Sequence, residues 1–159
     1  MKNLLLTAIL LFTFSLTAQT HQMVKHDGQT IDVNFIKTEN NLVYYTFPQS
    51  TEEQLISVYA IAQLTDKSKN TTVNVSEKIN MNSKSAYKNV IVLQKNQTFG
   101  LKESGVITSF YGGTKGETPL SFTTNGERRL KQNAALKGSP FIVILSNAPR
   151  DLKAVIYSY

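Results

Sequence analysis

The longest regular pattern of hydrophobic and polar positions lies in residues 119–137 and is helical. Small or apolar residues recur at every fourth position and would form one stripe along a helix: Phe122, Gly126, Leu130 and Ala134, with Leu136 at its edge. Thr118 is a suitable N-cap, and Pro119 suits the first helical position, where no N–H is needed. Gly138 suits the end of the helix. Ala135 falls outside the stripe and is expected to point elsewhere.

Gly126 weakens this helix, because glycine inside a helix costs about 1 kcal/mol relative to alanine. Two interpretations stay open: the helix begins near Asn125, or Gly126 lets a longer helix approach a sheet closely. We favour the longer helix. Residues 140–146, PFIVILS, follow directly and are apolar at consecutive positions. This run predicts a strand that is buried on both faces, as in the core of an α/β or α+β module.

Alternation with a period of two dominates the first half of the chain. Residues 30–37 place apolar and polar side chains on opposite faces, and residues 42–47 are rich in strand formers. The polar residues 39–41 between them predict a hairpin. Residues 53–65 fit either a helix or two strands. We predict a strand, a short turn at residues 58–60 and a second strand at residues 61–65.

The second half predicts further strands at residues 87–94, 98–102, 106–111 and 152–159, with turns at 95–97 and 103–105. The predicted fold class is α+β: a small antiparallel β-module followed by a sheet with one main helix. The predicted organisation has four parts: a signal peptide (1–18), an N-terminal β-module (19–66), a polar linker with an optional short strand at 72–75 (67–85), and a C-terminal α/β module (86–159).

Residues 1–18 have the pattern of a secretory signal peptide. Lys2 supplies the positive charge, residues 4–16 are apolar, and Ala18 is a small residue at the expected cleavage site. The apolar run is short for a membrane span, although an uncleaved anchor is the alternative. We therefore predict a periplasmic or secreted protein. No other transmembrane segment is predicted.

Candidate chemistry is sparse. The chain has no cysteine, which excludes disulfides, thiol nucleophiles and Cys-ligated zinc. No GxSxG motif occurs, and the eleven acidic residues form no pair on the predicted core elements. His21 and His26 lack a third ligand and are interpreted as a polar leader. The glycine-rich residues 111–119 depart from a phosphate-binding loop. We predict no enzyme, catalytic residue, cofactor or metal.

Charge and tyrosines point to binding instead. The formal net charge of +6 is compatible with an anionic surface component or an envelope protein as partner. The basic residues are scattered along the chain, so a solvated basic surface is the preferred interpretation of the charge, and export argues against nucleic acid. Tyrosines on strands often lie at the edge of a core, but they also form binding surfaces. The candidate interaction surface comprises Tyr44, Tyr45, Tyr111, Arg128, Arg129, Tyr157 and Tyr159.

A small-residue turn joins the predicted helix to the strand that follows it, in the segments RRLKQNAALKG and FIVIL. The residues concerned are Arg128, Leu130, Ala134, Ala135, Gly138 and Ile142 to Leu145. This half of the chain resembles the YbjQ-like family of heavy-metal-binding proteins and is similar to small envelope proteins of the RcsF stress-sensor type. The whole chain resembles exported proteins of Bacteroidetes type.

The resemblance implies an α/β module, with oligomerisation on the YbjQ-like side and protein–protein signalling on the RcsF-like side. This chain departs from both patterns, because it lacks cysteine for disulfides or lipid attachment and lacks histidine in this half. Together these features predict an exported, non-enzymatic envelope protein with a protein-interaction or stress-sensing role. The alternative is a self-assembling oligomer that binds a small molecule or an ion.

Overall fold

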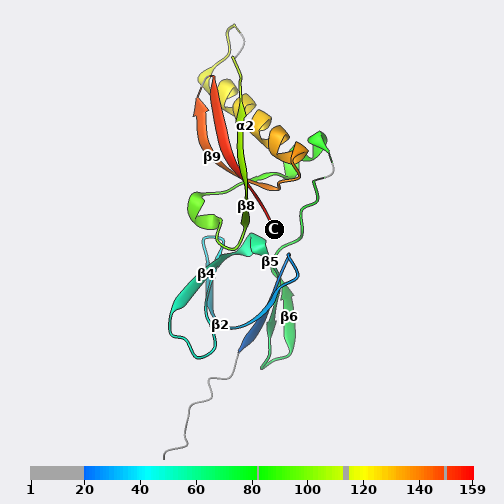
Figure 1. Cartoon of the computed structure of the whole chain (residues 1–159), viewed down its shortest axis with the longest axis vertical. Coiled ribbons are helices and arrows are strands. Elements are labelled where there is room, and N and C mark those ends of the chain that lie inside the picture. The colour runs from blue at the N-terminus through cyan, green and yellow to red at the C-terminus, as the bar shows by residue number, and fades with distance from the viewer. Residues whose placement is uncertain (1–19, 82, 113–114, 149) are drawn as a thin grey trace, which may run out of the picture.

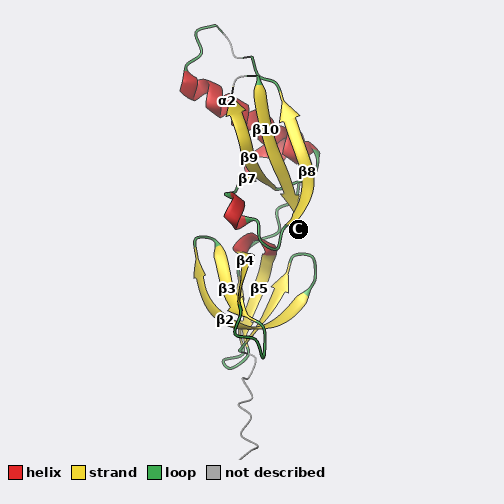
Figure 2. Ribbon diagram, turned by 60° about the vertical axis from the view of Figure 1, so that its left-hand side comes forward, coloured by secondary structure: helices red, strands yellow, loops and turns green. Residues whose placement is uncertain are grey.

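The first half of the chain forms a strongly curved antiparallel sheet, and the second half forms a smaller sheet with one long helix (Figures 1 and 2). This computed structural model describes residues 20–81, 83–112, 115–148 and 150–159. The predicted signal peptide lies outside these residues, as does part of the glycine-rich loop. The α+β fold class is confirmed. No helix among the described residues is both long and apolar enough to cross a membrane.

Six strands make the N-terminal sheet, in the order β4-β3-β2-β1-β5-β6. Their bounds are β1 (His21–Lys25), β2 (Thr30–Glu39), β3 (Leu42–Thr46), β4 (Glu53–Ser57), β5 (Ile61–Asp66) and β6 (Thr71–Asn74). The β2–β3 hairpin is confirmed, and its turn residues Asn40 and Asn41 have left-handed φ angles of 52° and 62°. The predicted strand, turn and strand in residues 53–65 are also confirmed, with a 3-10 turn at η1 (Val58–Ala60).

The polar-leader prediction was wrong. Residues His21–Lys25 form β1, a central strand paired with β2 on one side and β5 on the other. Its sequence, HQMVK, gives little hydrophobic alternation, but Met23 is fully buried. Two neighbours satisfy its backbone hydrogen bonds, so the tertiary context decides its conformation. The N-terminal sheet also reaches past residue 66, because the optional strand forms as β6 and pairs with β5.

The C-terminal sheet has four strands in the order β7-β9-β10-β8. Their bounds are β7 (Ile91–Val92), β8 (Lys102–Ser109), β9 (Phe141–Ala148) and β10 (Asp151–Ser158). The predicted strand at 87–94 was wrong in extent, because residues Lys84–Asn89 form the 3-10 segment η2 and only two residues of β7 pair with β9. The predicted turn at 103–105 was also wrong, because β8 runs through it with a bulge. The predicted turn at 95–97 is confirmed as η3 (Lys95–Gln97).

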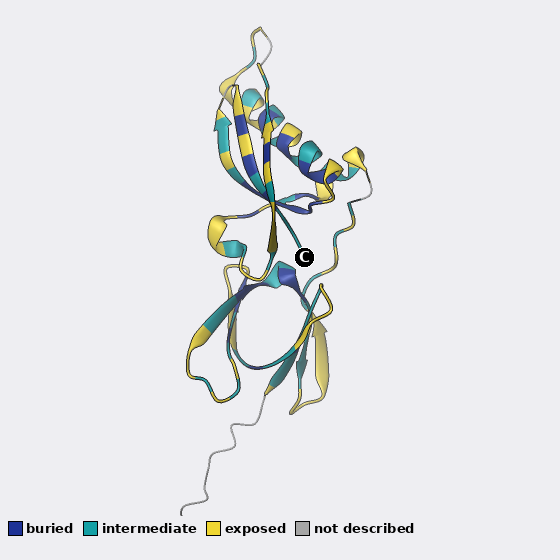
Figure 3. Cartoon of the chain, viewed as in Figure 1, coloured by how far each residue is buried: buried dark blue, intermediate teal, exposed yellow. Residues whose placement is uncertain are grey.

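The long helix, α2 (Pro119–Leu136), covers one face of the C-terminal sheet. Its predicted cap is confirmed, because the Thr118 side chain accepts a hydrogen bond from the Ser121 N–H at 3.2 Å. Gly126 is buried where α2 meets the sheet, so the longer helix and its close approach are confirmed. Ala135 is also buried, contrary to expectation, because the helix presents a wider face than a single stripe (Figure 3).

Strand β9 belongs to two cores at once. Ile142 packs with Leu130 and Ala134 of α2, whereas Phe141 and Val143 point to the other face. There they form a junction cluster with residues from both halves of the chain: Tyr59, Ile79, Ile91, Leu93, Leu101, Tyr157 and Tyr159. The prediction of a strand buried on both faces is confirmed for its first three residues. The chain end near Tyr159 lies between the two sheets (Figure 1).

We expect Gly126→Ala to lower the free energy of unfolding by about 1–3 kcal/mol, although alanine favours helix. An added Cβ would collide with the Asn147 side-chain oxygen and lie 2.9 Å from Leu152 Cδ2. Both side chains are held in place: Asn147 Nδ2 donates to the Thr123 carbonyl at 3.0 Å, and Leu152 is fully buried. Urea denaturation measures the change. The control, Thr124→Ala on the exposed face of α2, should be neutral or stabilising. Equal behaviour of the two variants would contradict the close packing.

Candidate functional site

The residues of the predicted interaction surface do not share one face. Tyr45 is buried in the N-terminal core, where burial raises the pKa of its hydroxyl above the ordinary value. Tyr44 points to the opposite face of β3, and Lys37 Nζ lies 4.7 Å from its ring centroid. These two tyrosines therefore support the sheet from its two sides and form no common surface with the C-terminal residues.

Tyr157 and Tyr159 belong to the junction cluster between the sheets. The Tyr159 hydroxyl accepts a hydrogen bond from the Ile79 N–H at 2.8 Å. The centroid of the Tyr159 ring lies 5.3 Å from that of Phe141 and 4.7 Å from that of His26. Burial raises the pKa of the Tyr159 hydroxyl. These tyrosines are thus used for packing, which is the alternative that the sequence left open.

His26 completes the junction from the N-terminal sheet. Its Nε2 lies 2.9 Å from the Ser76 hydroxyl, which itself donates to the Ile61 carbonyl at 2.7 Å, so Nε2 carries the proton. Burial, reinforced by the Lys78 cation, lowers the pKa of His26 below its ordinary value. The junction therefore favours a neutral imidazole.

Tyr111 and Arg129 are brought together near the start of α2. The Tyr111 hydroxyl donates to Glu117 at 2.8 Å, and the Arg129 guanidinium lies 5.1 Å from the Tyr111 ring. Asn125 Nδ2 donates to both partners, at 3.1 Å to Tyr111 and 2.6 Å to Glu117. The hydrogen bond to Glu117 raises the pKa of Tyr111. These contacts fix the segment after β8 onto the helix.

Arg128 lies apart, beside a depression of about 480 Å³ on the outer face of α2. Leu120 and Tyr87 also line it, as do Glu127 and Lys131, which form an ion pair at 2.8 Å. The Glu127 carboxylate neutralises the Lys131 cation in this pair, so less positive charge is left to attract an anionic ligand. The outer helix face is therefore a weaker candidate than its charge alone suggests.

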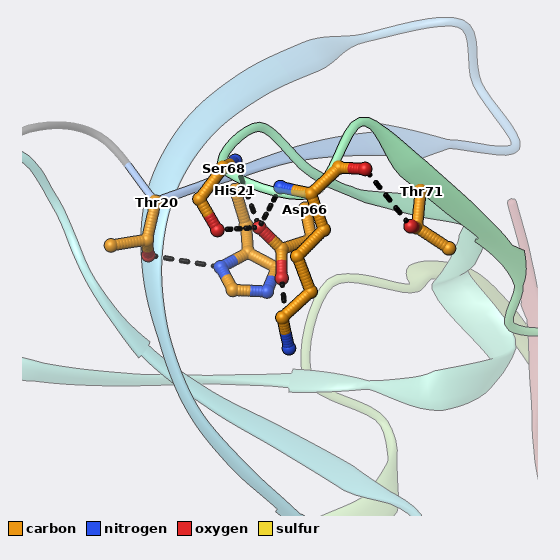
Figure 4. Close-up of polar contacts among 6 residues, drawn as sticks. Thr20, His21, Asp66, Ser68 and Thr71 are labelled. Carbon is orange, nitrogen blue, oxygen red and sulfur yellow. Dashed lines mark hydrogen bonds and ion pairs between the residues drawn. The ribbon is translucent and has the colours of Figure 1, made fainter.

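A smaller hollow of about 260 Å³ lies between His21 and the β5–β6 turn (Figure 4). The Asp66 carboxylate accepts hydrogen bonds from the Ser68 hydroxyl at 2.6 Å, the Ser68 N–H at 2.9 Å and the Lys69 N–H at 3.2 Å. The Ser68 hydroxyl is the main reason that the pKa of Asp66 is lowered. The Thr20 hydroxyl lies 2.9 Å from His21 Nδ1. The polar groups beside this hollow therefore serve to stabilise the β5–β6 turn. Among the described residues, no three His, Cys, Asp or Glu side chains are grouped to hold a metal.

A third feature combines exposed backbone with a lined groove. Strand β8 is an edge of the C-terminal sheet and pairs only with β10 among the described strands. A groove of about 300 Å³ runs between this edge and the C-terminal half of α2. Its lining residues are Val106, Ile107 and Thr108 from the strand and Asn133, Leu136 and Lys137 from the helix. Figures 1 and 2 show β8 as the outer strand beside α2.

The two halves of β8 differ in how well they are protected. Natural edge strands are usually blunted by charges and bulges, which prevent pairing with other chains. The first half of β8 has both devices, with Lys102, Glu103 and a bulge at Ser104. The second half, from Val106 to Ser109, has no charge and is rich in β-branched residues. The unprotected half is the one that borders the groove.

Positive charge is concentrated in this half of the molecule. Residues 86–159 contain ten Lys and Arg against four Asp and Glu, whereas residues 19–85 contain six against seven. The residues that line the groove include the basic Lys137 and the polar Asn133 but no Asp or Glu. The groove is therefore suited to a chain segment that brings backbone hydrogen-bonding groups and negative charge.

No protein-family model, curated protein or solved structure matches the chain. The similarity to YbjQ-like and RcsF-type proteins stays a prediction.

We expect the free energy of unfolding to fall as the pH is lowered from 7.5 to 5.5, in part because of His26. The pKa of His26 is lower in the folded protein than the unfolded value of about 6.5. The contribution of His26 to stability is therefore complete above the unfolded pKa and is lost as the pH falls from there through the lower pKa of the folded protein. His26→Gln should flatten the pH dependence measured by urea denaturation. The control is His21→Gln; a slope that survives His26→Gln and vanishes in the control would refute the assignment.

Proposed function

We propose that this chain is an exported, non-enzymatic envelope protein that binds an extended segment of a partner protein at the edge of β8. The observation that carries the proposal is the uncharged half of β8 lying open beside a groove walled by α2. The signal-peptide pattern of residues 1–18 supports export.

Strand addition explains how such an edge binds. In an edge strand, the N–H and C=O groups of alternate residues point away from the sheet and lack a neighbouring strand. An extended peptide laid along Val106 to Ser109 would supply those partners and would continue the sheet. Leu136, which is 62% exposed, would cover the peptide from the helix side and remove its hydrogen bonds from competition with water.

The other half of the molecule supports the site by holding the sheet. Phe141 and Val143 of β9 anchor the C-terminal sheet on the junction cluster, while α2 packs on the opposite face. Strand β10 lies between β9 and β8, so the position of β8 follows from that of β9. A rigid support of this kind reduces the ordering that the protein must undergo on binding.

We expect Leu136→Ala to weaken binding about tenfold, because it removes an apolar wall of the groove. The probe is a peptide selected from a displayed random decapeptide library on the chain from Gln19 to Tyr159. Fluorescence anisotropy measures affinity, and hydrogen exchange locates the bound peptide. The matched control is Leu120→Ala, which truncates an exposed leucine of the same helix outside the groove.

The peptide should protect backbone amides in Val106 to Ser109. Protection confined to another strand, or equal losses of affinity in the two leucine variants, would refute the proposed site. A failure to select any peptide would count against peptide capture altogether.

A further inference from the structure

We infer that the groove beside β8 selects an acidic extended segment, in which a carboxylate pairs with Lys137 at one end of the groove. The inference rests on the proposed function, because it specifies the partner of the same site. Three observations support it: the charges of the lining residues, the hydrogen-bonded carbonyls at the C-terminal end of α2, and the similar distances between the two cations and along the exposed edge.

The C-terminal end of α2 does not repel an anion as a bare helix end would. Helix carbonyls at this end normally carry a partial negative charge. Here the N–H of Lys137 donates to Ala134 O at 3.0 Å, and Gly138 donates to Ala135 O at 3.0 Å. The Ser139 N–H also donates to Ala134 O at 3.0 Å. With these carbonyls partnered, the Lys137 ammonium is the dominant local charge at this end of the groove.

A second cation marks the other end. Arg129 Nη1 donates to the Phe110 carbonyl at 3.2 Å, immediately beyond the end of β8. Arg129 and Lys137 are separated by about 12 Å along the helix, at 1.5 Å per residue. The four steps from Val106 to Phe110, whose carbonyl Arg129 contacts, span about 13 Å, at 3.3 Å per residue. A segment that covers the unprotected edge therefore lies with one end near each cation.

The side-chain pattern of the occupant follows from the two faces of the sheet. In an added strand, alternate side chains would point toward α2 and would meet Leu136 and Asn133. The remaining side chains would lie on the face away from α2. There Val106, Val155 and Val143 are neighbours across three strands, and the added side chains would continue that row. Val106 is 49% exposed, so this row has apolar area left to cover. The preferred segment is thus apolar or β-branched in its middle and acidic at its ends.

A second copy of the chain fits this site less well. The C-terminal half carries the excess of ten cationic over four anionic side chains, and a copy docked edge to edge would bring the same excess. Like charges in a contact disfavour association. The complementary partner is therefore a different chain with a local excess of Asp or Glu.

The experiment compares three capped peptides with the same alternating Val/Thr centre, flanked on each side by Glu, Gln or Lys. Fluorescence anisotropy with the chain from Gln19 to Tyr159 measures the three affinities at low and moderate salt. We expect the Glu peptide to bind about fivefold more tightly than the Gln peptide, as partly exposed ion pairs allow, and the Lys peptide to bind most weakly. Salt should compress these differences.

Charge reversal assigns the effect to the groove. Lys137→Glu should abolish most of the preference, because Arg129 still attracts the Glu flank at the other end, and Lys137→Gln should reduce the preference by about half as much. Lys88→Glu is the matched control, because it makes the same change of net charge at an exposed residue of η2 outside the groove. It should leave the preference intact.

The possible outcomes separate this inference from the proposed function. Equal binding of the three peptides, with protection of β8 in hydrogen exchange, would overturn the acidic preference and leave peptide capture standing. A preference that Lys88→Glu reduces as much as Lys137→Glu would overturn the assignment to Lys137. A lack of binding by all three peptides, or self-association that protects β8 instead, would overturn both.

Discussion

The burial of β9 on both faces is the constraint on which the rest of the structure depends. Ile142 is committed to the helix-side core, while Phe141 and Val143 are committed to the junction with the N-terminal sheet. Neither half can shift along this strand without exposing apolar surface from one of the two cores. The ring of Tyr159 contacts His26 and Phe141 at the same junction. Hydrophobic burial holds the two halves together there, and these ring contacts fix their orientation.

Elements whose own sequence decides their conformation were predictable. Residues Pro119–Leu136 have a cap, a periodic stripe and a glycine stop, and Asn40-Asn41 suits a tight hairpin turn. Strand β1 was missed because its order comes from two neighbours rather than from its residues. The length of the strand at 87–94 was overestimated because its apolar residues do not all serve one sheet. Val90 packs in the helix-side core, whereas Leu93 packs in the junction cluster. Hydrophobicity alone does not distinguish these cases.

The candidate site was less predictable than the fold. Tyrosine content pointed to a surface, but Tyr45, Tyr157 and Tyr159 pack in cores or at the junction, which composition cannot reveal. The groove depends on strand order: β8 becomes an edge only because β10 inserts between it and β9. The sequence shows that residues Val106 to Ser109 carry no charge. This points to a binding edge only once the strand order places β8 at the edge of the sheet.

The shortness of the unprotected edge sets the lifetime of whatever binds there. Lys102, Glu103 and the bulge at Ser104 leave four residues of β8 for pairing. A contact of that length buries far less than the roughly 1,600 Å² of a standard protein interface, so it would form and dissolve quickly. Durable attachment would then require several such segments on one partner, or several copies of this chain on one surface. Such a protein would respond to the local density of its targets more than to a single encounter.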